Sequence, residues 1–270
     1  MYKKFAEFTL LYILLVYLPS SVFAQARHEN SRLDSIVMSR RVRVCIWPEY
    51  YGITFRNPKT QQLSGVDADL ALELGKDLGA SVEFVDSSFA TLVIDVTSNK
   101  CDVAMFAVGV TPTRAEKLRF TKPTLVSDIY AITTRTNREI KTWDDIDQQG
   151  VVVAVMKGTL HEPVMRERLK AATLKVVETP MAREQEVSSG RADVFMTDYP
   201  YSRRMLETTD WARLVSPALT FHETPYAYAV ALGDEKWAQR MDKFVRDIQT
   251  DGRLLKAARH YKLDSLVVNR

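Results

Sequence analysis

The order in which apolar residues recur along the chain constrains its fold more than any other feature. From about residue 39 onward, short β-branched runs alternate with stretches of helical spacing, which is the pattern of α/β units with parallel strands. The expected elements are a strand at 41–47, a helix at 66–78, a strand at 81–85, a short helix at 91–98 and a strand at 101–106. Together they predict one βαβαβ unit.

The same order recurs further along the chain. The second set of expected elements is a strand at 151–156, a helix at 162–172, a strand at 174–177, a short helix at 182–188 and a strand at 192–196. A local echo accompanies it, because residues 96–105 read VTSNKCDVAM and residues 187–196 read VSSGRADVFM. Both stretches run from a helix end into a strand, so we infer an internal duplication.

Extended segments follow both units. Residues 121–134 lead out of the first unit and residues 220–231 out of the second, and helices are expected at 235–250 and 254–261. A chain of 270 residues can form one large domain or two modest ones. We predict an α/β fold of two βαβαβ lobes with a two-strand hinge. Lobe 1 comprises residues 27–127 plus 224–270, and lobe 2 comprises residues 128–223.

Residues 1–26 have the composition of a secretory signal peptide. Lys3 and Lys4 precede an apolar run at 8–18, Pro19 breaks that run, and small residues near Ala24 and Ala26 suit cleavage. The run is shorter than the about 20 apolar residues that a membrane-spanning helix needs. Neither cysteine lies near the cleavage region, so we expect an exported, soluble protein that is not a lipoprotein.

Charge and histidine placement argue against several function classes. The 37 Lys and Arg exceed the 34 Asp and Glu by only 3 and are scattered, which leaves no basic patch for nucleic acid. The four histidines lack metal-ligand spacing, and His161 reads as the start of a helix. The two cysteines lack a paired zinc pattern, and no serine stands in a nucleophile elbow. We therefore expect no catalytic residue, metal, cofactor or nucleic-acid partner.

The place of a binding site follows from the fold class. In open parallel sheets, ligands bind beyond the carboxyl ends of the strands, so the site is expected just after residues 47, 106, 156 and 196. Gly109 follows the third expected strand of the first unit, and Thr111 and Pro112 suit the start of a helix. Arg114 would lie in its first turn, where its guanidinium can hold a carboxylate. A solvent-exposed surface arginine is the alternative.

Two further strand ends carry polar residues. Gly158 allows a close backbone turn, and Thr159 can cap the next helix while free N–H groups face an anion; a plain strand-to-helix turn explains the pair as well. Asp198 suits an ammonium group, since a buried cation must be paired, although it can also cap a helix. Arg114, Thr159 and Asp198 together match an α-amino acid.

Aromatic residues gather where the first strand ends. Trp47, Tyr50 and Tyr51 follow that strand, and Phe89 follows the second. Aromatic faces in a cleft can clamp an apolar or cationic side chain, but buried aromatic residues more often belong to a core. We predict that Trp47 and Tyr50 reach the ligand.

Residues 33–263 resemble the extracytoplasmic solute-binding proteins, family 3, of polar amino-acid ABC transporters. The motifs that carry the resemblance are LDSI at 33–36, RVRV at 41–44, LSGVDADL at 63–70, KCDV at 100–103, TPTR at 111–114, FTKP at 120–123, KGT at 157–159, AD at 192–193, TD at 197–198, PYAYAV at 225–230 and DGR at 251–253. The resemblance implies the type II periplasmic-binding-protein fold. It also implies that Arg114, Thr159 and the backbone near Gly109 take a carboxylate and that Asp198 takes an ammonium group.

One stretch departs from the family pattern. Family members usually read Tyr-x-Pro-Phe after the first strand, whereas this chain reads YYGI at 50–53, and Trp47 stands where polar residues are common. The carboxylate anchor is therefore better supported than the side-chain pocket. Trp47 favours a pocket that is smaller or more apolar than one built for a cationic side chain.

The resemblance implies a monomeric periplasmic receptor that closes its lobes on an amino acid or related small acid and delivers it to a membrane ABC permease. A sensory role with another membrane partner stays open. The same fold also carries an enzyme, cyclohexadienyl dehydratase. Its proposed acid is a glutamate at the position of Tyr201, and a tyrosine of ordinary pKa near 10 is a poor general acid. We therefore predict a binding protein and not an enzyme.

The two cysteines lie on strands that are neighbours if the sheet follows the family's order. Cys45 is inside the first expected strand and Cys101 begins the third. Export permits a disulfide, but the required geometry cannot be judged from sequence. We predict two small buried thiols and keep the disulfide as the alternative.

Overall fold

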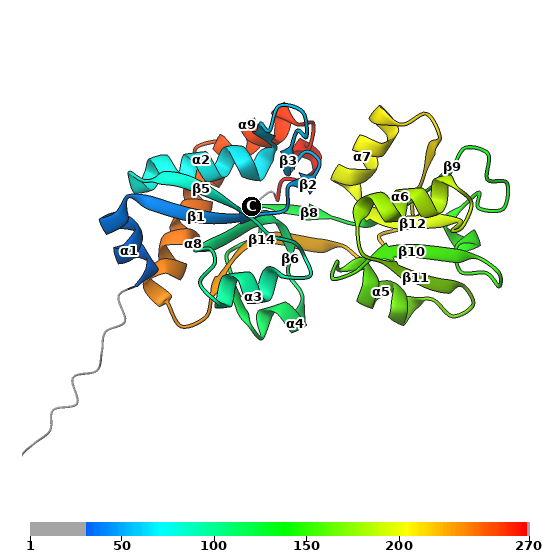
Figure 1. Cartoon of the computed structure of the whole chain (residues 1–270), viewed down its shortest axis with the longest axis horizontal. Coiled ribbons are helices and arrows are strands. Elements are labelled where there is room, and N and C mark those ends of the chain that lie inside the picture. The colour runs from blue at the N-terminus through cyan, green and yellow to red at the C-terminus, as the bar shows by residue number, and fades with distance from the viewer. Residues whose placement is uncertain (1–30, 269–270) are drawn as a thin grey trace, which may run out of the picture.

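The structure is a computed structural model that describes residues 31–268. The predicted signal peptide at 1–26 lies outside the described residues. Within them, no helix has the length and apolar character needed to cross a membrane. Figure 1 shows two groups of elements, each with its own sheet, joined by extended segments.

The first sheet combines early and late parts of the chain. Its path is β5 (Ser81–Asp86), β1 (Arg41–Ile46), β6 (Val103–Gly109), β14 (Thr224–Ala231) and β7 (Leu118–Phe120), with β8 (Leu125–Ser127) paired to β14. Strands β5, β1 and β6 are parallel, and β14 is antiparallel to β6. Its helices are α1 (Arg32–Ser39), α2 (Val66–Leu78), α3 (Leu92–Thr97), α4 (Pro112–Ala115), α8 (Glu235–Thr250) and α9 (Arg253–His260).

The second sheet repeats that arrangement. Its order is β11 (Thr173–Val177), β10 (Val152–Met156), β12 (Val194–Asp198), β9 (Ile129–Thr134) and β13 (Ala212–Val215). Strands β11, β10 and β12 are parallel, and β9 is antiparallel to β12. Its helices are α5 (His161–Arg168), α6 (Pro180–Ser188) and α7 (Tyr199–Thr208), with a 3₁₀ turn at Trp143–Asp145.

The sequence echo corresponds to one structural device used twice. The Asp102 carboxylate accepts a hydrogen bond from the backbone N–H of Arg43 at 2.7 Å, and the Asp193 carboxylate accepts one from Val152 N–H at 2.8 Å. Each aspartate therefore fastens the loop before the third strand to the start of the first strand of its unit. The predicted duplication is confirmed at the level of strand order and of these two contacts.

The segments between the sheets lie side by side. β8 pairs with β14 in antiparallel register, so Ser127 faces Thr224. The Asp128 carboxylate accepts hydrogen bonds from the backbone N–H groups of Phe221 and His222, at 2.8 and 2.7 Å. The two-strand hinge of the predicted fold is therefore one laterally bonded ribbon.

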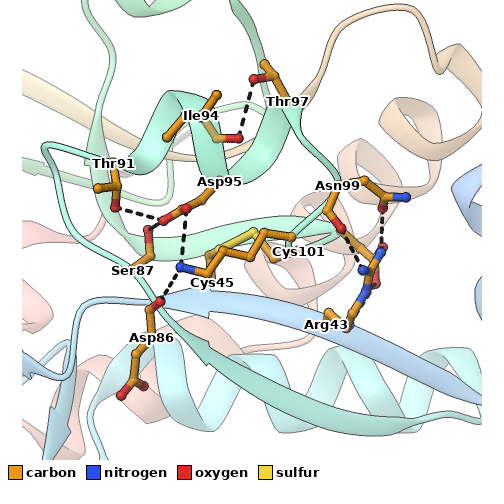
Figure 2. The surroundings of a disulfide bond; sticks show 12 residues. Arg43, Cys45, Asp86, Ser87, Thr91, Ile94, Asp95, Thr97, Asn99 and Cys101 are labelled. Atoms are coloured by element: carbon orange, nitrogen blue, oxygen red, sulfur yellow. Dashed lines mark hydrogen bonds and ion pairs between the residues drawn. A yellow bond between two sulfur atoms is a disulfide. The ribbon is translucent and has the colours of Figure 1, made fainter.

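The prediction of two free thiols is wrong, because Cys45 and Cys101 form a disulfide (Figure 2). Cys45 lies on β1 and Cys101 just before β6, and these strands are parallel neighbours. Their Cα atoms are 5.6 Å apart, within the range that a disulfide spans. The decisive quantity is a distance between strands, which the sequence does not contain. Nearby, Arg43 donates to the backbone and side chain of Asn99, at 2.6 Å each.

Several elements were not predicted. They are α1, α7, β7, β13 and a small antiparallel sheet made of β2 (Glu49–Tyr50), β3 (Thr54–Arg56) and β4 (Leu63–Ser64), together with a 3₁₀ turn at Asp264–Leu266. The strands among them are short, so they carry little periodic signal. By contrast, the helices at 66–78 and 235–250 have the predicted bounds. In α8, the buried Trp237, Met241, Phe244 and Ile248 recur at helical spacing and pack into the first core.

Candidate functional site

A pocket lies where the carboxyl ends of the two sheets' strands meet. Its cavity volume is about 30 Å³. Such a volume admits roughly one or two waters, whereas ligand pockets usually measure ~300–1,000 Å³. The pocket is lined by Trp47, Tyr50, Phe89, Ala107, Gly109, Arg114, Thr159, Leu160, His161, Arg183, Thr197, Asp198, Tyr201 and Tyr226.

Arg114 lies in the first turn of α4, as predicted, and it is buried rather than on the surface. Thr111 caps α4 by accepting from Arg114 N–H, and Pro112 begins the helix. The guanidinium donates to the carbonyl of Gly109 at 2.9 Å and, across the pocket, to the carbonyl of Gly158 at 3.1 Å. Burial lowers the pKa of Arg114 to about 10, so the group stays charged at neutral pH. It is therefore a buried cation that donates hydrogen bonds to the backbone of both lobes.

Asp198 ends β12 and is the N-cap of α7, where its carboxylate accepts from Tyr201 N–H at 3.1 Å. The capping alternative is thus confirmed, but the same carboxylate also accepts from the hydroxyls of Tyr50 and Tyr226. Tyr226 is 2.9 Å away on β14, and Tyr50 belongs to the small sheet β2–β4. Burial raises the pKa of Asp198, and the three donors oppose that rise. Asp198 is the carboxylate that lines the pocket, and it accepts from two tyrosine hydroxyls of the first lobe and one backbone N–H of the second.

Thr159 lines the pocket but Gly158 does not, and the contacts of both residues differ from the prediction. Thr159 does not cap α5, because its hydroxyl donates to the carbonyl of Met156 at 2.7 Å. The Gly158 N–H is not free either, since it donates to the Glu162 carboxylate at 3.0 Å. Gly158 has φ +75°, and a Cβ there would lie 2.6 Å from Cα of Ala90. Glycine is required because the turn presses directly on the first lobe.

Three aromatic rings form one wall of the pocket. Trp47 lies 5.1 Å from Tyr50 and 5.2 Å from Phe89, measured between ring centroids, and both contacts are typical aromatic pairs. Trp47 and Tyr50 therefore line the pocket, and Phe89 lines it as well; that Trp47 and Tyr50 contact a ligand stays a prediction. Phe89 also lies under the Arg114 guanidinium at 5.4 Å. Tyr51 is outside the pocket and packs on Phe55 at 4.3 Å.

The backbone of β6 enters the pocket at Ala107 through an uncommon conformation. Ala107 has φ +49°, and β6 is irregular against β14 there. The buried Asp67, on α2, accepts from Ala107 N–H at 2.6 Å and from the Tyr228 hydroxyl at 3.0 Å. Burial raises the pKa of Asp67 to about 6. Asp67 therefore holds the pocket backbone from behind, a role that the DADL motif alone did not reveal.

The prediction missed Arg183 and His161 as pocket residues. Arg183 lies on α6 after Thr179 and Pro180, a helix start like that before Arg114, and this parallel could have found it. His161 begins α5, and burial together with Arg183 lowers its pKa to about 3, so it is neutral. Tyr226 also lines the pocket, but the pattern of residues 220–231 indicates only a crossing segment and does not single it out.

Tyr201 occupies the place of the proposed enzymatic acid and does line the pocket. Its hydroxyl donates to the Glu184 carboxylate. Burial is the main cause that raises its pKa well above the ordinary value. A phenol that holds its proton this tightly is unsuited to general acid chemistry near neutral pH. Among residues 31–268, no group of three or more His, Cys, Asp or Glu is placed to hold a metal ion.

Comparison with known proteins reveals relatives of two kinds. Cyclohexadienyl dehydratase of Pseudomonas aeruginosa is 27% identical over 88% of each chain. The L-cystine-binding protein TcyJ of Escherichia coli is 24% identical over 72% of each chain. Among solved structures, an ancestral amino-acid-binding protein described as a precursor of cyclohexadienyl dehydratase has a TM-score of 0.79 and 28% identity. It covers 86% of this chain and 99% of that chain.

The fold is that of the type II periplasmic binding proteins, to which this solved structure also belongs. The sequence profile described as bacterial extracellular solute-binding proteins, family 3, matches residues 42–264, which include every residue that lines the pocket. The chain therefore belongs to the bacterial extracellular solute-binding proteins, family 3.

Proposed function

We propose that this protein captures an amino acid or a related small carboxylate between two lobes and delivers it to a membrane ABC permease. The observation that carries the proposal is the opposition of Arg114 and Asp198, a buried cation from the first lobe and a buried carboxylate from the second, in one pocket. Such a pair matches the carboxylate and ammonium groups of an α-amino acid. Gly109, Gly158 and Thr159 complete the carboxylate side, and Trp47 and Tyr50 the wall.

In the described state, the protein itself occupies these groups. Arg114 donates to the Gly158 carbonyl across the pocket, and Tyr50 donates across it to Asp198. A ligand must replace these contacts, so binding requires the lobes to separate about the β8–β14 ribbon and to close again. The proposed lobes are residues 27–127 plus 224–270 and residues 128–223. A ligand that bridges the lobes stabilises the closed state by its differential contacts.

Titration calorimetry against the common amino acids tests the proposal. Arg114→Ala should weaken binding about 100-fold or more, because a charge-assisted bidentate contact is lost from a buried site. Arg119→Ala removes a half-exposed arginine on β7 that does not line the pocket, and it should leave affinity unchanged. Undiminished binding by Arg114→Ala would show that the carboxylate lies elsewhere.

Asp198→Asn tests the ammonium side. The variant should lose affinity for amino acids but lose little for the matching keto acids, which carry no ammonium group. An equal loss for both ligand classes would remove Asp198 from ammonium recognition. Because Asp198 caps α7, circular dichroism should accompany the titration.

A second candidate function is a cyclohexadienyl dehydratase-like enzyme, and the 27% identical relative favours it. Tyr201 and its raised pKa weigh against it, since a dehydration needs an acid to protonate the departing hydroxyl. Incubation of the purified protein with prephenate or arogenate decides the question. An aromatic product would establish the enzyme, and its absence would support the binding role.

The export route and partner are also part of the proposal. We place the protein in the periplasm after removal of residues 1–26, as a monomer without a lipid anchor. Gel filtration measures the oligomeric state, and mass spectrometry of the exported protein locates the mature N-terminus. A sensory partner is distinguished from a permease by reconstituted uptake, which only the permease would support.

A further inference from the structure

Arg183 is a second buried cation of the pocket, and most of its donors have no protein partner. Its side chain is 2% exposed and lines the pocket from α6. One guanidinium nitrogen, Nη1, donates to the carbonyl of Met196 at 3.0 Å. The other two, Nε and Nη2, are buried and have no hydrogen-bond partner among the described residues. Its guanidinium carbon lies 4.7 and 4.6 Å from the ring centroids of Phe195 and Tyr201.

A guanidinium in this setting needs an anion. Burial of a charge is unfavourable unless the charge is paired and hydrogen-bonded. The rings of Phe195 and Tyr201 contact the guanidinium of Arg183, but they give Nε and Nη2 no hydrogen-bond acceptor among the described residues. Among residues 31–268, Arg183 forms no ion pair with a carboxylate. The Nε–Nη2 edge is the part of a guanidinium that binds a carboxylate through two parallel hydrogen bonds.

His161 lines the same pocket as Arg183 and also has buried nitrogens without a hydrogen-bond partner among the described residues. The imidazole lines the pocket and is 8% exposed, and neither ring nitrogen makes a hydrogen bond of ordinary geometry among the described residues, although the backbone of Thr197 is near enough to act on its pKa. It is close enough to Arg183 and Arg114 for both charges to lower its pKa. A neutral imidazole still offers one N–H donor, so it can add a third hydrogen bond to an anion held by Arg183.

The charges that line the pocket do not balance. Arg114 and Arg183 contribute two positive charges, and Asp198 contributes one negative charge. An amino acid with a neutral side chain carries no net charge and would leave one buried cation uncompensated. An amino acid with a second carboxylate carries one net negative charge and would balance the pocket.

We propose that Arg183 and His161 form a second anion subsite and that the ligand is an acidic amino acid, with one carboxylate at Arg114 and the other at Arg183. This inference rests on the proposed binding function and specifies its ligand class. The aromatic wall of Trp47, Tyr50 and Phe89 then covers the short aliphatic link between the two carboxylates.

Two ligand pairs test the subsite, because L-glutamate and L-glutamine, or L-aspartate and L-asparagine, differ only in the second carboxylate. Calorimetry on the wild-type protein should show the acid of at least one pair bound about 30-fold or more tightly than its amide. In Arg183→Gln that ratio should fall to about threefold or less, and Arg183→Lys should recover part of it. Arg191→Gln, an exposed arginine that follows the same helix, should leave the ratio unchanged.

The outcomes separate the subsite from the proposed function. If neutral or basic amino acids bind the wild type in an Arg114-dependent way and acidic ones do not, the subsite is refuted and the binding function stands. If no amino acid of any class binds, both are refuted. If Arg183→Gln does not fold, His161→Asn serves instead, and a wild-type ratio that this variant leaves intact counts against the subsite. Circular dichroism of each variant accompanies its titration.

Discussion

The two βαβαβ units share a frame but differ in how they reinforce it. Both have the strand order second–first–third, and both bond an aspartate, Asp102 or Asp193, to the start of the first strand. By register, Cys45 and Cys101 of the first unit correspond to Ala154 and Ala192 of the second. The same place in the fold is thus covalently joined in one lobe and only packed in the other.

The difference follows the path of the chain. Lobe 1 combines early segments with the late elements β14, α8 and α9, whereas lobe 2 is one continuous insertion between β8 and β14. Asp102 also pairs with two arginines, Arg32 at 3.0 Å and Arg43 at 2.6 Å, while Asp193 has no such pair among the described residues. The comparison indicates that the duplicated frame needs only the aspartate contact and that the further links belong to the lobe assembled from distant segments.

Removal of the disulfide should have the largest effect on stability. Cys45→Ala/Cys101→Ala frees a loop of 56 residues, and the loop-entropy relation gives a loss of about 4 kcal/mol. Urea denaturation of the variant and of the oxidised wild type measures it. Reduction of the wild type under the same conditions should reproduce the loss, and a loss below about 1 kcal/mol would mean that the link is not a stabilising difference between the lobes.

Removal of Asp102 should destabilise the protein more than removal of Asp193. Asp102→Ala removes the carboxylate partner of two partly buried arginines and the acceptor of one backbone N–H, so it should cost about 3 kcal/mol. Asp193→Ala removes one backbone hydrogen bond and should cost about 1 kcal/mol. Denaturation of both variants measures the difference, and equal losses would contradict the unequal reinforcement of the lobes.

The buried Asp67 should make the free energy of unfolding depend on pH. Because its folded pKa is about 6, the native state holds more protons than the unfolded state between about pH 4 and 6, and its unfolding free energy falls as the pH rises through that window. The fall should be about 2 to 3 kcal/mol. Asp67→Asn has no carboxyl group that titrates at this position. The difference in free energy of unfolding between the variant and the wild type should therefore change between pH 4 and 7. If that difference in free energy stays constant over this pH range, Asp67 is not the group that titrates.

The smallest effect is a gain in lobe 2. Ala154→Cys/Ala192→Cys copies the linked positions of lobe 1 into the second unit, and both alanines are buried. An oxidised pair should add about 1 to 2 kcal/mol, less than the native link contributes, because engineered disulfides often distort their surroundings. Thiol titration shows whether the bond forms. If both introduced thiols stay free, positions 154 and 192 match Cys45 and Cys101 in strand register but do not bring their side chains close enough to bond.

Periodic segments were predictable and short ones were not. The α8 helix has sixteen residues and a buried face at helical spacing, so its bounds follow from the pattern. The β2 and β4 strands have two residues each and depend on tertiary pairing, which leaves no periodicity to read. For the pocket, Arg114 was predictable because Thr111 and Pro112 mark its helix start. Arg183 was not singled out, because its own helix start was read only as secondary structure.

The sequence by itself determined the duplicated α/β frame, the strand ends at which polar residues gather, and the family, because these depend on local periodicity and on motifs in a fixed order. Only the tertiary structure decided the Cys45–Cys101 link, the three donors around Asp198, and the gathering of Arg114, His161 and Arg183 around one pocket. Each of these depends on distances between segments far apart in the chain. Such distances follow from how the two sheets pack and close, and no local pattern encodes them.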